Sequence, residues 1–178
     1  LHKLIDRFIA GEIKFKGRDK SKASLLSYQG TKNHLQAFQK ARGYKVDFET
    51  VTLDFFYQYT TYLKNTLKLS QNTIGKDIRL LKVFMNEAVD LGYTTNYGHK
   101  HKKFTVQTKE TDNVYLTEKE VIHLYQHDLS DNPQVEGARD LFVFGCFTGL
   151  RFSDYSNVKQ ENIVQRDGDY YIKMFTQK

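Results

Sequence analysis

Apolar residues recur every three or four positions through most of residues 1–92, the spacing of one face of an α-helix. The pattern predicts amphipathic helices over residues 1–12, 24–42, 52–68 and 71–91. Thr52 and Ser70 stand at the expected N-caps of the last two, while Gly43 and Gly92 are natural helix stops. Helix 24–42 is expected to bury Leu25, Tyr28, Leu35, Phe38 and Ala41.

The longest predicted helix, residues 71–91, has two different faces. Its expected buried face consists of Ile74, Ile78, Leu81, Met85 and Ala88. Roughly opposite, Lys76, Arg79 and Lys82 follow Asn72 and Thr73 at the helix start. A helix fits the major groove of B-DNA, where long basic side chains reach phosphates and guanine edges. A DNA-facing surface and an ordinary solvated helix face both remain open on this pattern.

Helical periodicity lapses over residues 93–113, which we interpret as an interdomain linker. Its lysines at Lys100, Lys102 and Lys103 suit a strand that lies across a DNA backbone. The same lysines would repel a cation bound by the neighbouring histidines, so no metal site is predicted.

Order resumes at Thr117, which forms a capping box with Glu120 at the start of a helix. This helix is expected to bury the side chains of Val121, Leu124 and Tyr125. Near the end of the chain, Asp167-Gly168 separates two β-rich runs, residues 162–166 and 170–175, and predicts a β-hairpin.

An almost uninterrupted apolar run, residues 141–147, ends a further predicted helix over residues 136–148. Because the run is apolar all round, it predicts a buried helix, with a buried strand as the less favoured alternative. Gly149 stops the helix, and Arg151, two residues later, is anchored by this helix but points out of it. Asp154 is close enough to hold the guanidinium through charge-assisted hydrogen bonds, which predicts an anion site.

The charge of the chain indicates which anion to expect. The net charge is +6, but residues 1–112 hold 20 Lys and Arg against 11 Asp and Glu, a net of +9. Residues 113–178 hold 7 against 10, a net of −3. A basic first part favours a polyanionic partner, and nucleic acid is the commonest one.

Other features of the sequence indicate where in the cell the protein is expected and whether the sequence is part of a longer chain. The lone Cys146 cannot form an intramolecular disulfide, which favours a reducing, cytoplasmic location. No apolar stretch approaches the roughly 20 residues needed to cross a bilayer, so no membrane partner is expected. The chain begins with Leu1 and stops after Lys178, which predicts a piece of a longer protein.

The run Thr148-Gly149-Leu150-Arg151-Phe152-Ser153-Asp154 resembles the first catalytic motif of the tyrosine recombinase (phage and transposon integrase) family. The capped helix before it, the hairpin after it and the long helix upstream also match the family pattern. The resemblance implies a mainly α fold. Residues 1–110 would be a helical SAM-like core-binding, DNA-binding domain with a basic linker. Residues 111–178 would be the truncated N-terminal part of an α+β catalytic domain with a β-hairpin.

By this resemblance Arg151 binds the scissile phosphate and Asp154 steadies it. Lys178 is the better match to the family's catalytic lysine, and Lys173, which we place mid-strand, is the alternative. The lysine would donate a proton to the leaving oxygen. The family uses no cofactor or metal. Its downstream His-x-x-Arg pair, the following His or Trp and the tyrosine nucleophile are absent, and none of the 12 tyrosines present matches that position.

The implied activity is site-specific DNA recombination or integration through a 3′-phosphotyrosine, as by the integrase of a mobile element. Double-stranded DNA would be the partner, with self-assembly on DNA as a tetrameric synapse. The piece in hand is expected to bind duplex DNA through Thr73, Lys76, Arg79, Lys82, Lys100, Lys102 and Lys103 without cleaving it. The alternatives are a non-catalytic helical DNA-binding or architectural module, and a protein-interaction domain whose binding hardly depends on salt.

Overall fold

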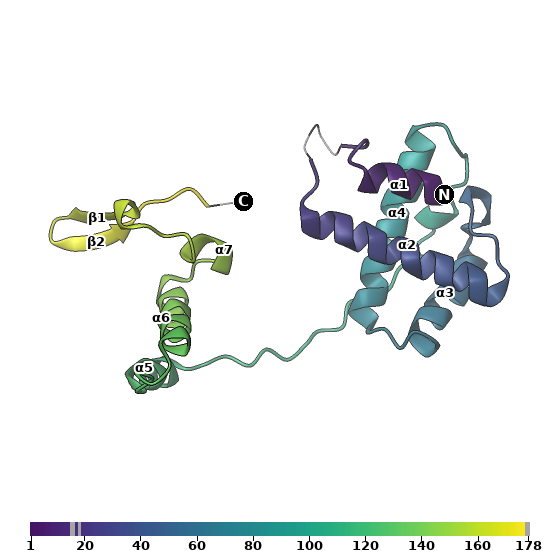
Figure 1. The fold of residues 1–178 in the computed structure, drawn as a ribbon. Coiled ribbons are helices and arrows are strands. Elements are labelled where there is room, and N and C mark those ends of the chain that lie inside the picture. Colours follow the sequence, from purple (N-terminus) through teal and green to yellow (C-terminus); the bar gives the residue numbers. More distant parts are fainter. Residues whose placement is uncertain (15–16, 18, 177–178) are drawn as a thin grey trace. The chain divides into compact units, whose positions relative to one another are not determined.

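The computed structural model describes residues 1–14, 17 and 19–176, which fall into two units, residues 1–111 and 112–178 (Figure 1). The first unit contains α1 (His2–Ile9), α2 (Lys22–Arg42), η1 (Phe48–Thr50), α3 (Leu53–Asn65), α4 (Gln71–Asp90) and η2 (Gly98–Lys100). The second contains α5 (Glu118–Gln126), α6 (Pro133–Thr148), α7 (Phe152–Tyr155), η3 (Gln160–Asn162), β1 (Ile163–Arg166) and β2 (Asp169–Ile172). The predicted fold class, mainly α with a hairpin, is confirmed.

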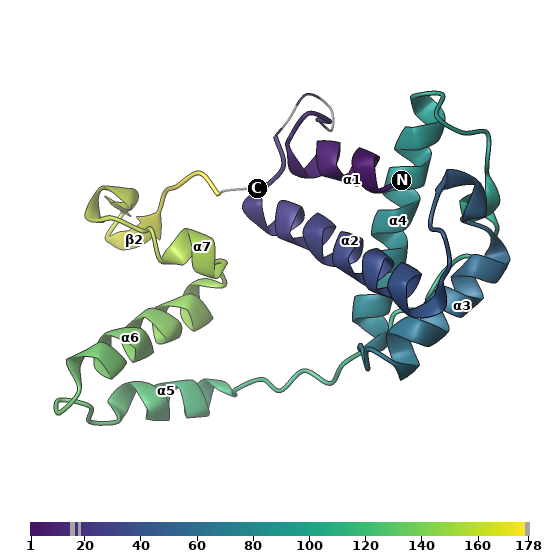
Figure 2. The same ribbon diagram turned by 45° about the vertical axis from the view of Figure 1, so that its right-hand side comes forward.

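Helices α1, α2 and α3 pack against α4, which forms the centre of the first unit (Figure 2). All five residues of the predicted buried face of α4 are buried. Phe84, which the periodicity did not single out, is also buried and its ring lies 5.1 Å from that of Phe8. The expected caps are present, because Thr52 and Ser70 accept hydrogen bonds from backbone N–H groups in the first turns of α3 and α4.

The end of α2 departs from the expected pattern. Gly43 ends the helix in the left-handed conformation, φ 61°, as predicted. Ala41, which we expected to face inward, is exposed. The buried residues of α2 end at Phe38, so its last turn extends beyond the core.

Residues 93–106 are part of the first unit, so their interpretation as a linker was wrong. Phe104 is completely buried, and its ring lies 4.9 Å from that of Phe56. His99 is buried against α4, where its Nε2 is 2.9 Å from Asn86 Oδ1. Two anchors at irregular spacing bury this segment without producing a helical period, which is why the sequence pattern missed them.

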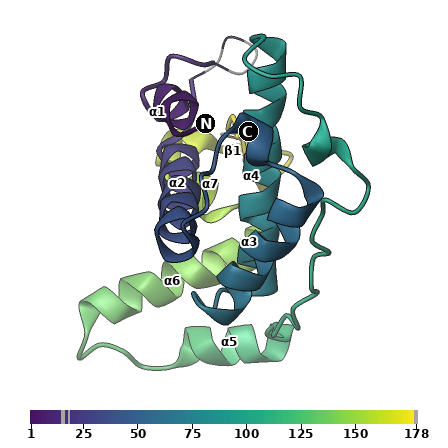
Figure 3. The same ribbon diagram turned by 90° about the vertical axis from the view of Figure 1, so that its right-hand side faces the viewer.

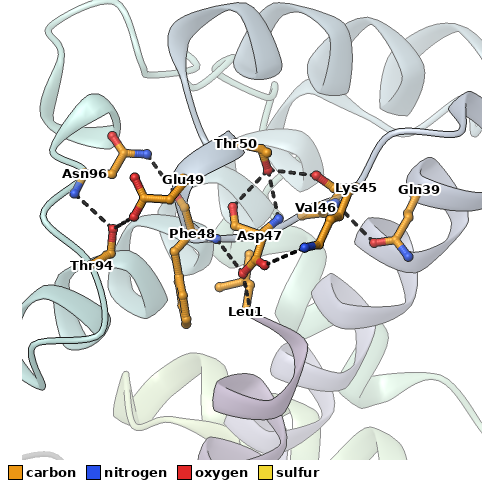
Figure 4. Close-up of polar contacts among 10 residues, drawn as sticks. All are labelled: Leu1, Gln39, Lys45, Val46, Asp47, Phe48, Glu49, Thr50, Thr94 and Asn96. Atoms are coloured by element: carbon orange, nitrogen blue, oxygen red, sulfur yellow. Dashed lines mark hydrogen bonds and ion pairs between the residues drawn. The ribbon is translucent and has the colours of Figure 1, made fainter.

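A polar network joins this segment to the loop between α2 and α3 (Figure 4). The side chain of Asn96 donates to the carbonyl oxygens of Phe48 (2.7 Å) and Val51 (3.1 Å). Thr94 donates its hydroxyl to Glu49. The Asn96 amide thereby supplies a donor to two carbonyl oxygens that lie outside the α-helices, and the two segments are held together.

Asp77 lies on α4 with only 5% of its surface exposed. Its carboxylate accepts a hydrogen bond from Thr31 Oγ1 at 2.9 Å and lies 2.5 Å from His34 Nδ1. The hydrogen bond to Asp77 raises the pKa of His34 above its ordinary value of 6.5. This cluster joins α2 to α4 through a buried charged group, an arrangement that apolar periodicity could not predict.

The second unit confirms several local predictions. Thr117 and Glu120 form the capping box of α5. Gly149 ends α6 with φ 64°. Strands β1 and β2 pair antiparallel, from Ile163 opposite Ile172 to Arg166 opposite Asp169. The turn between them has positive φ at both central residues, the type that Asp-Gly favours.

The predicted burial of residues 141–147 was wrong, although the run is helical. Within α6 only Val143 is buried, whereas Phe142, Cys146 and Phe147 are exposed. Tyr125 of α5, which we expected inside, is also exposed. Within this unit α6 packs chiefly against α5 and α7, and two short helices leave part of an all-round apolar helix uncovered. None of the helices in the described part of the chain has the length and apolarity that a membrane crossing requires.

Candidate nucleic-acid interface

The polar side of α4 carries the side chains that the sequence suggested for DNA contact. Thr73, Lys76 and Arg79 are exposed, and Lys82 is half-buried. They alternate with core residues because the helix turns 100° per residue, so burying one face turns the other outward. Asp77, which follows Lys76 in sequence, is buried and is not part of this exposed side.

After α4 the chain turns back and runs along it, from its C-terminal toward its N-terminal end (Figure 3). His99 meets Asn86 near the C-terminal end, and Lys82 Nζ lies 5.9 Å from the ring centroid of Phe104. Farther along, a Cβ on Gly75 would lie 3.7 Å from the carbonyl oxygen of Val106. We call residues 98–109 the return segment.

The return segment ends in three hydrogen bonds to the first turn of α4. The side chain of Asn72 donates to the Lys109 carbonyl oxygen and accepts from the Lys109 N–H, both at 2.9 Å. Gln71 Nε2 donates to the carbonyl oxygen of Gln107 at 2.7 Å. These contacts hold Lys109 beside the start of α4.

The tertiary structure therefore places the return segment, which carries four lysines, alongside the helix that carries Lys76, Arg79 and Lys82. We call these seven cations the basic surface: Lys76, Arg79, Lys82, Lys100, Lys102, Lys103 and Lys109. Throughout residues 1–14, 17 and 19–176, no carboxylate forms an ion pair with any of these seven. Unneutralised cations on one helix and its neighbouring segment create a positive potential that attracts polyanions.

His99 lies between these cations without adding to their charge. Burial, together with Lys100 and Lys82, lowers its pKa below 6.5. The imidazole is therefore neutral at pH 7, and its Nε2–H donates to Asn86 Oδ1. His99 holds the return segment against α4.

The residues predicted for phosphoryl chemistry lie in the second unit. Arg151 is exposed at the N-cap of α7, and its carbonyl oxygen accepts a hydrogen bond from the Asp154 N–H at 2.8 Å. Asp154 itself is only 3% exposed. Helix α7 sits closely on α6, because a Cβ on Gly145 would come within 2.5 Å of the Tyr155 ring. Only glycine at that position lets α7 approach so near.

The structure changes the comparison between the two candidate lysines. Strand β2 ends at Ile172, so the exposed Lys173 directly follows the strand. Our placement of Lys173 mid-strand, the reason for ranking it second, was wrong because β2 is shorter than the apolar pattern indicated. Lys178 lies outside the described residues. Both lysines remain predictions for the catalytic role.

Sequence reasoning placed Asn72 on the expected DNA-facing surface but missed its contact with Lys109, and it missed Gln71 and the positioning contacts of Asn86 and Asp77 altogether. A side-chain amide in the first turn of a helix gives no sign that it bonds to the backbone of another segment. Its partner lies 37 positions away, and no local pattern links the two.

Residues 4–106 match the family model of the phage integrase SAM-like domain, which covers more than half of the chain. The chain belongs to this family. The phage integrase SAM-like domain is characteristic of the N-terminal core-binding region of tyrosine recombinases. Its matched range includes all of the basic surface except Lys109. No curated protein and no solved structure matches the chain.

Proposed function

We propose that the first unit is a DNA-binding domain that contacts duplex DNA through the basic surface, and that the protein acts in site-specific recombination. The observation that carries this proposal is the joining of α4 and the return segment into one unneutralised basic surface within a phage integrase SAM-like domain. Lys and Arg contacts to phosphates release condensed counterions, which supplies much of the affinity for duplex DNA. Thr73, at the start of α4, would add a hydroxyl contact to the backbone.

The salt dependence of binding tests this surface. Lys76→Ala/Arg79→Ala/Lys82→Ala is expected to reduce the slope of log K against log salt by about 3, because each lost phosphate contact contributes about 0.9. Fluorescence anisotropy with a labelled duplex at several salt concentrations measures the slope.

A matched control removes the same charge elsewhere. Lys40, Arg42 and Lys45 are exposed near the end of α2, and their triple alanine variant lowers the net charge by the same amount. We expect it to change the slope by less than about 1. Equal effects of the two triple variants would mean that only the overall charge matters, and would contradict a specific surface on α4.

For the second unit we propose the first part of a recombinase catalytic domain. Arg151 would bind the scissile phosphate, since its planar guanidinium forms bidentate hydrogen bonds and offsets charge on the phosphoryl oxygens. Asp154, one helical turn away, would hold the arginine. Lys178 or Lys173 would protonate the leaving 5′-oxygen after attack by a tyrosine. This proposal rests on the exposed Arg151 following a glycine helix stop, with the hairpin after it.

In this proposal the first unit supplies most of the affinity for DNA, and Arg151 in the second unit acts in the chemical step. Arg151→Ala is expected to change the affinity for uncleaved duplex DNA by less than about twofold, because one phosphate contact among many is lost. The same anisotropy titration measures it. A loss as large as that of the triple variant on α4 would contradict the proposed division of labour between the two units.

A further inference from the structure

The pairing between Asn72 and Lys109 uses both ends of one side-chain amide. Nδ2 donates to the Lys109 carbonyl oxygen and Oδ1 accepts from the Lys109 N–H, so the side chain pairs with a single residue's backbone from both sides. An amide is the side-chain group that offers a donor and an acceptor in this geometry. Gln71 adds the bond to Gln107. We call these three bonds the clasp.

Asn72 is available for the clasp because another residue caps the helix. Ser70 Oγ accepts the hydrogen bond from the Thr73 N–H, so the cap of α4 does not need Asn72. Beyond Phe104, Val106 is only partly buried and residues 107–111 are exposed. Few apolar contacts therefore hold this end of the return segment, and the clasp is its main restraint.

We propose that Asn72 is a positioning residue that orders the end of the return segment on α4 before DNA binds. The clasp fixes Lys109 beside the α4 cations, and it also fixes the place where the chain leaves the first unit. A segment ordered in advance loses less conformational entropy on binding, which raises affinity without a new contact to the ligand. The effect on DNA binding rests on the proposed function, whereas the clasp itself does not.

Hydrogen exchange in the DNA-free protein tests the clasp. Asn72→Ala is expected to speed exchange of the Lys109 amide at least about tenfold, since that amide loses its acceptor. The Phe104 amide, which donates to the His101 carbonyl oxygen, should be unchanged. Asn72→Asp keeps the acceptor but loses the donor, so it should give an intermediate rate. Unchanged exchange at Lys109 in Asn72→Ala would overturn the clasp.

Duplex binding tests the positioning role. Asn72→Ala is expected to weaken duplex binding about three- to tenfold, because the end of the return segment then loses its conformational entropy only when DNA binds. The unfolding midpoint should be unchanged. Asn33→Ala is the matched control, as Asn33 is exposed on α2 and bonds only to Gln29 among the described side chains. Equal affinity of the Asn72→Ala and Asn33→Ala variants would overturn the positioning role. Failure of the unaltered protein to bind duplex DNA would overturn the proposed function. Hydrogen exchange at the Lys109 amide would still test the clasp, because that measurement needs no DNA.

Discussion

Phe104→Ala is expected to lower the free energy of unfolding of the first unit by about 3–5 kcal/mol, the cost of truncating a fully buried phenylalanine. The Phe104 side chain is completely buried, and its ring packs on Phe56. Its removal leaves a cavity that the neighbouring helices can fill only in part. Chemical denaturation followed by circular dichroism, with exchange of the Leu81 amide as a local probe, measures the change.

The same substitution should also weaken DNA binding at temperatures where the unit remains folded. Phe104 anchors the middle of the return segment, directly after Lys102 and Lys103, so loosening it disorders part of the basic surface. Phe175→Ala serves as the control because Phe175 is fully exposed. A cost below about 1 kcal/mol for Phe104→Ala would show that residues 98–106 are a linker after all, since exposed substitutions cost within about 0.5 kcal/mol.

Asp77→Ala is expected to destabilise the first unit by about 3 kcal/mol, because it leaves the buried Thr31 hydroxyl and the half-buried His34 without their acceptor. Thr31 is completely buried, and His34 loses the carboxylate that supports its charged form. The cluster also fixes how α4 is rotated against α2, and so which side chains of α4 face solvent. Equilibrium denaturation at pH 6 measures the loss.

A second acid on the same helix supplies the control for Asp77. Asp90→Ala removes an exposed carboxylate at the end of α4, and its effect should stay within about 0.5 kcal/mol. Comparable effects at both positions would mean that the buried cluster contributes nothing particular to stability.

The difference in free energy of unfolding between the unaltered protein and Asp77→Ala should depend on pH, and this dependence tests whether His34 is the partner of Asp77. Because the pKa of His34 is raised in the folded state, the protonated pair contributes its full stability below pH 6.5. That contribution is lost as the pH rises through the folded pKa of His34. The cost of Asp77→Ala should therefore shrink between pH 6 and pH 9. His2 and His99, whose pKa values are lowered, remain in both proteins and cancel in the difference.

The local sequence determined the helices and their ends. Ser70 and Thr117 cap helix N-termini and Gly149 ends a helix, and each acts on backbone groups within one turn of itself. Their roles could therefore be predicted from the sequence alone. The inward face of α4 followed from a 3.6-residue period. The Asp-Gly turn followed from backbone sterics at two adjacent residues. The family resemblance, seen first around Arg151, is supported by the match over residues 4–106.

Only the tertiary structure decided which distant segments share a surface. The return segment, its anchors His99 and Phe104, and the clasp at Asn72 depend on contacts between residues that no period relates. Burial of Asp77 likewise required partners on another helix. The exposure of Phe147 in α6 depends on how many elements surround that helix, whereas hydropathy reports only the preference of each side chain for burial. The sequence predicted a basic helix and a basic linker separately, and packing placed the two side by side.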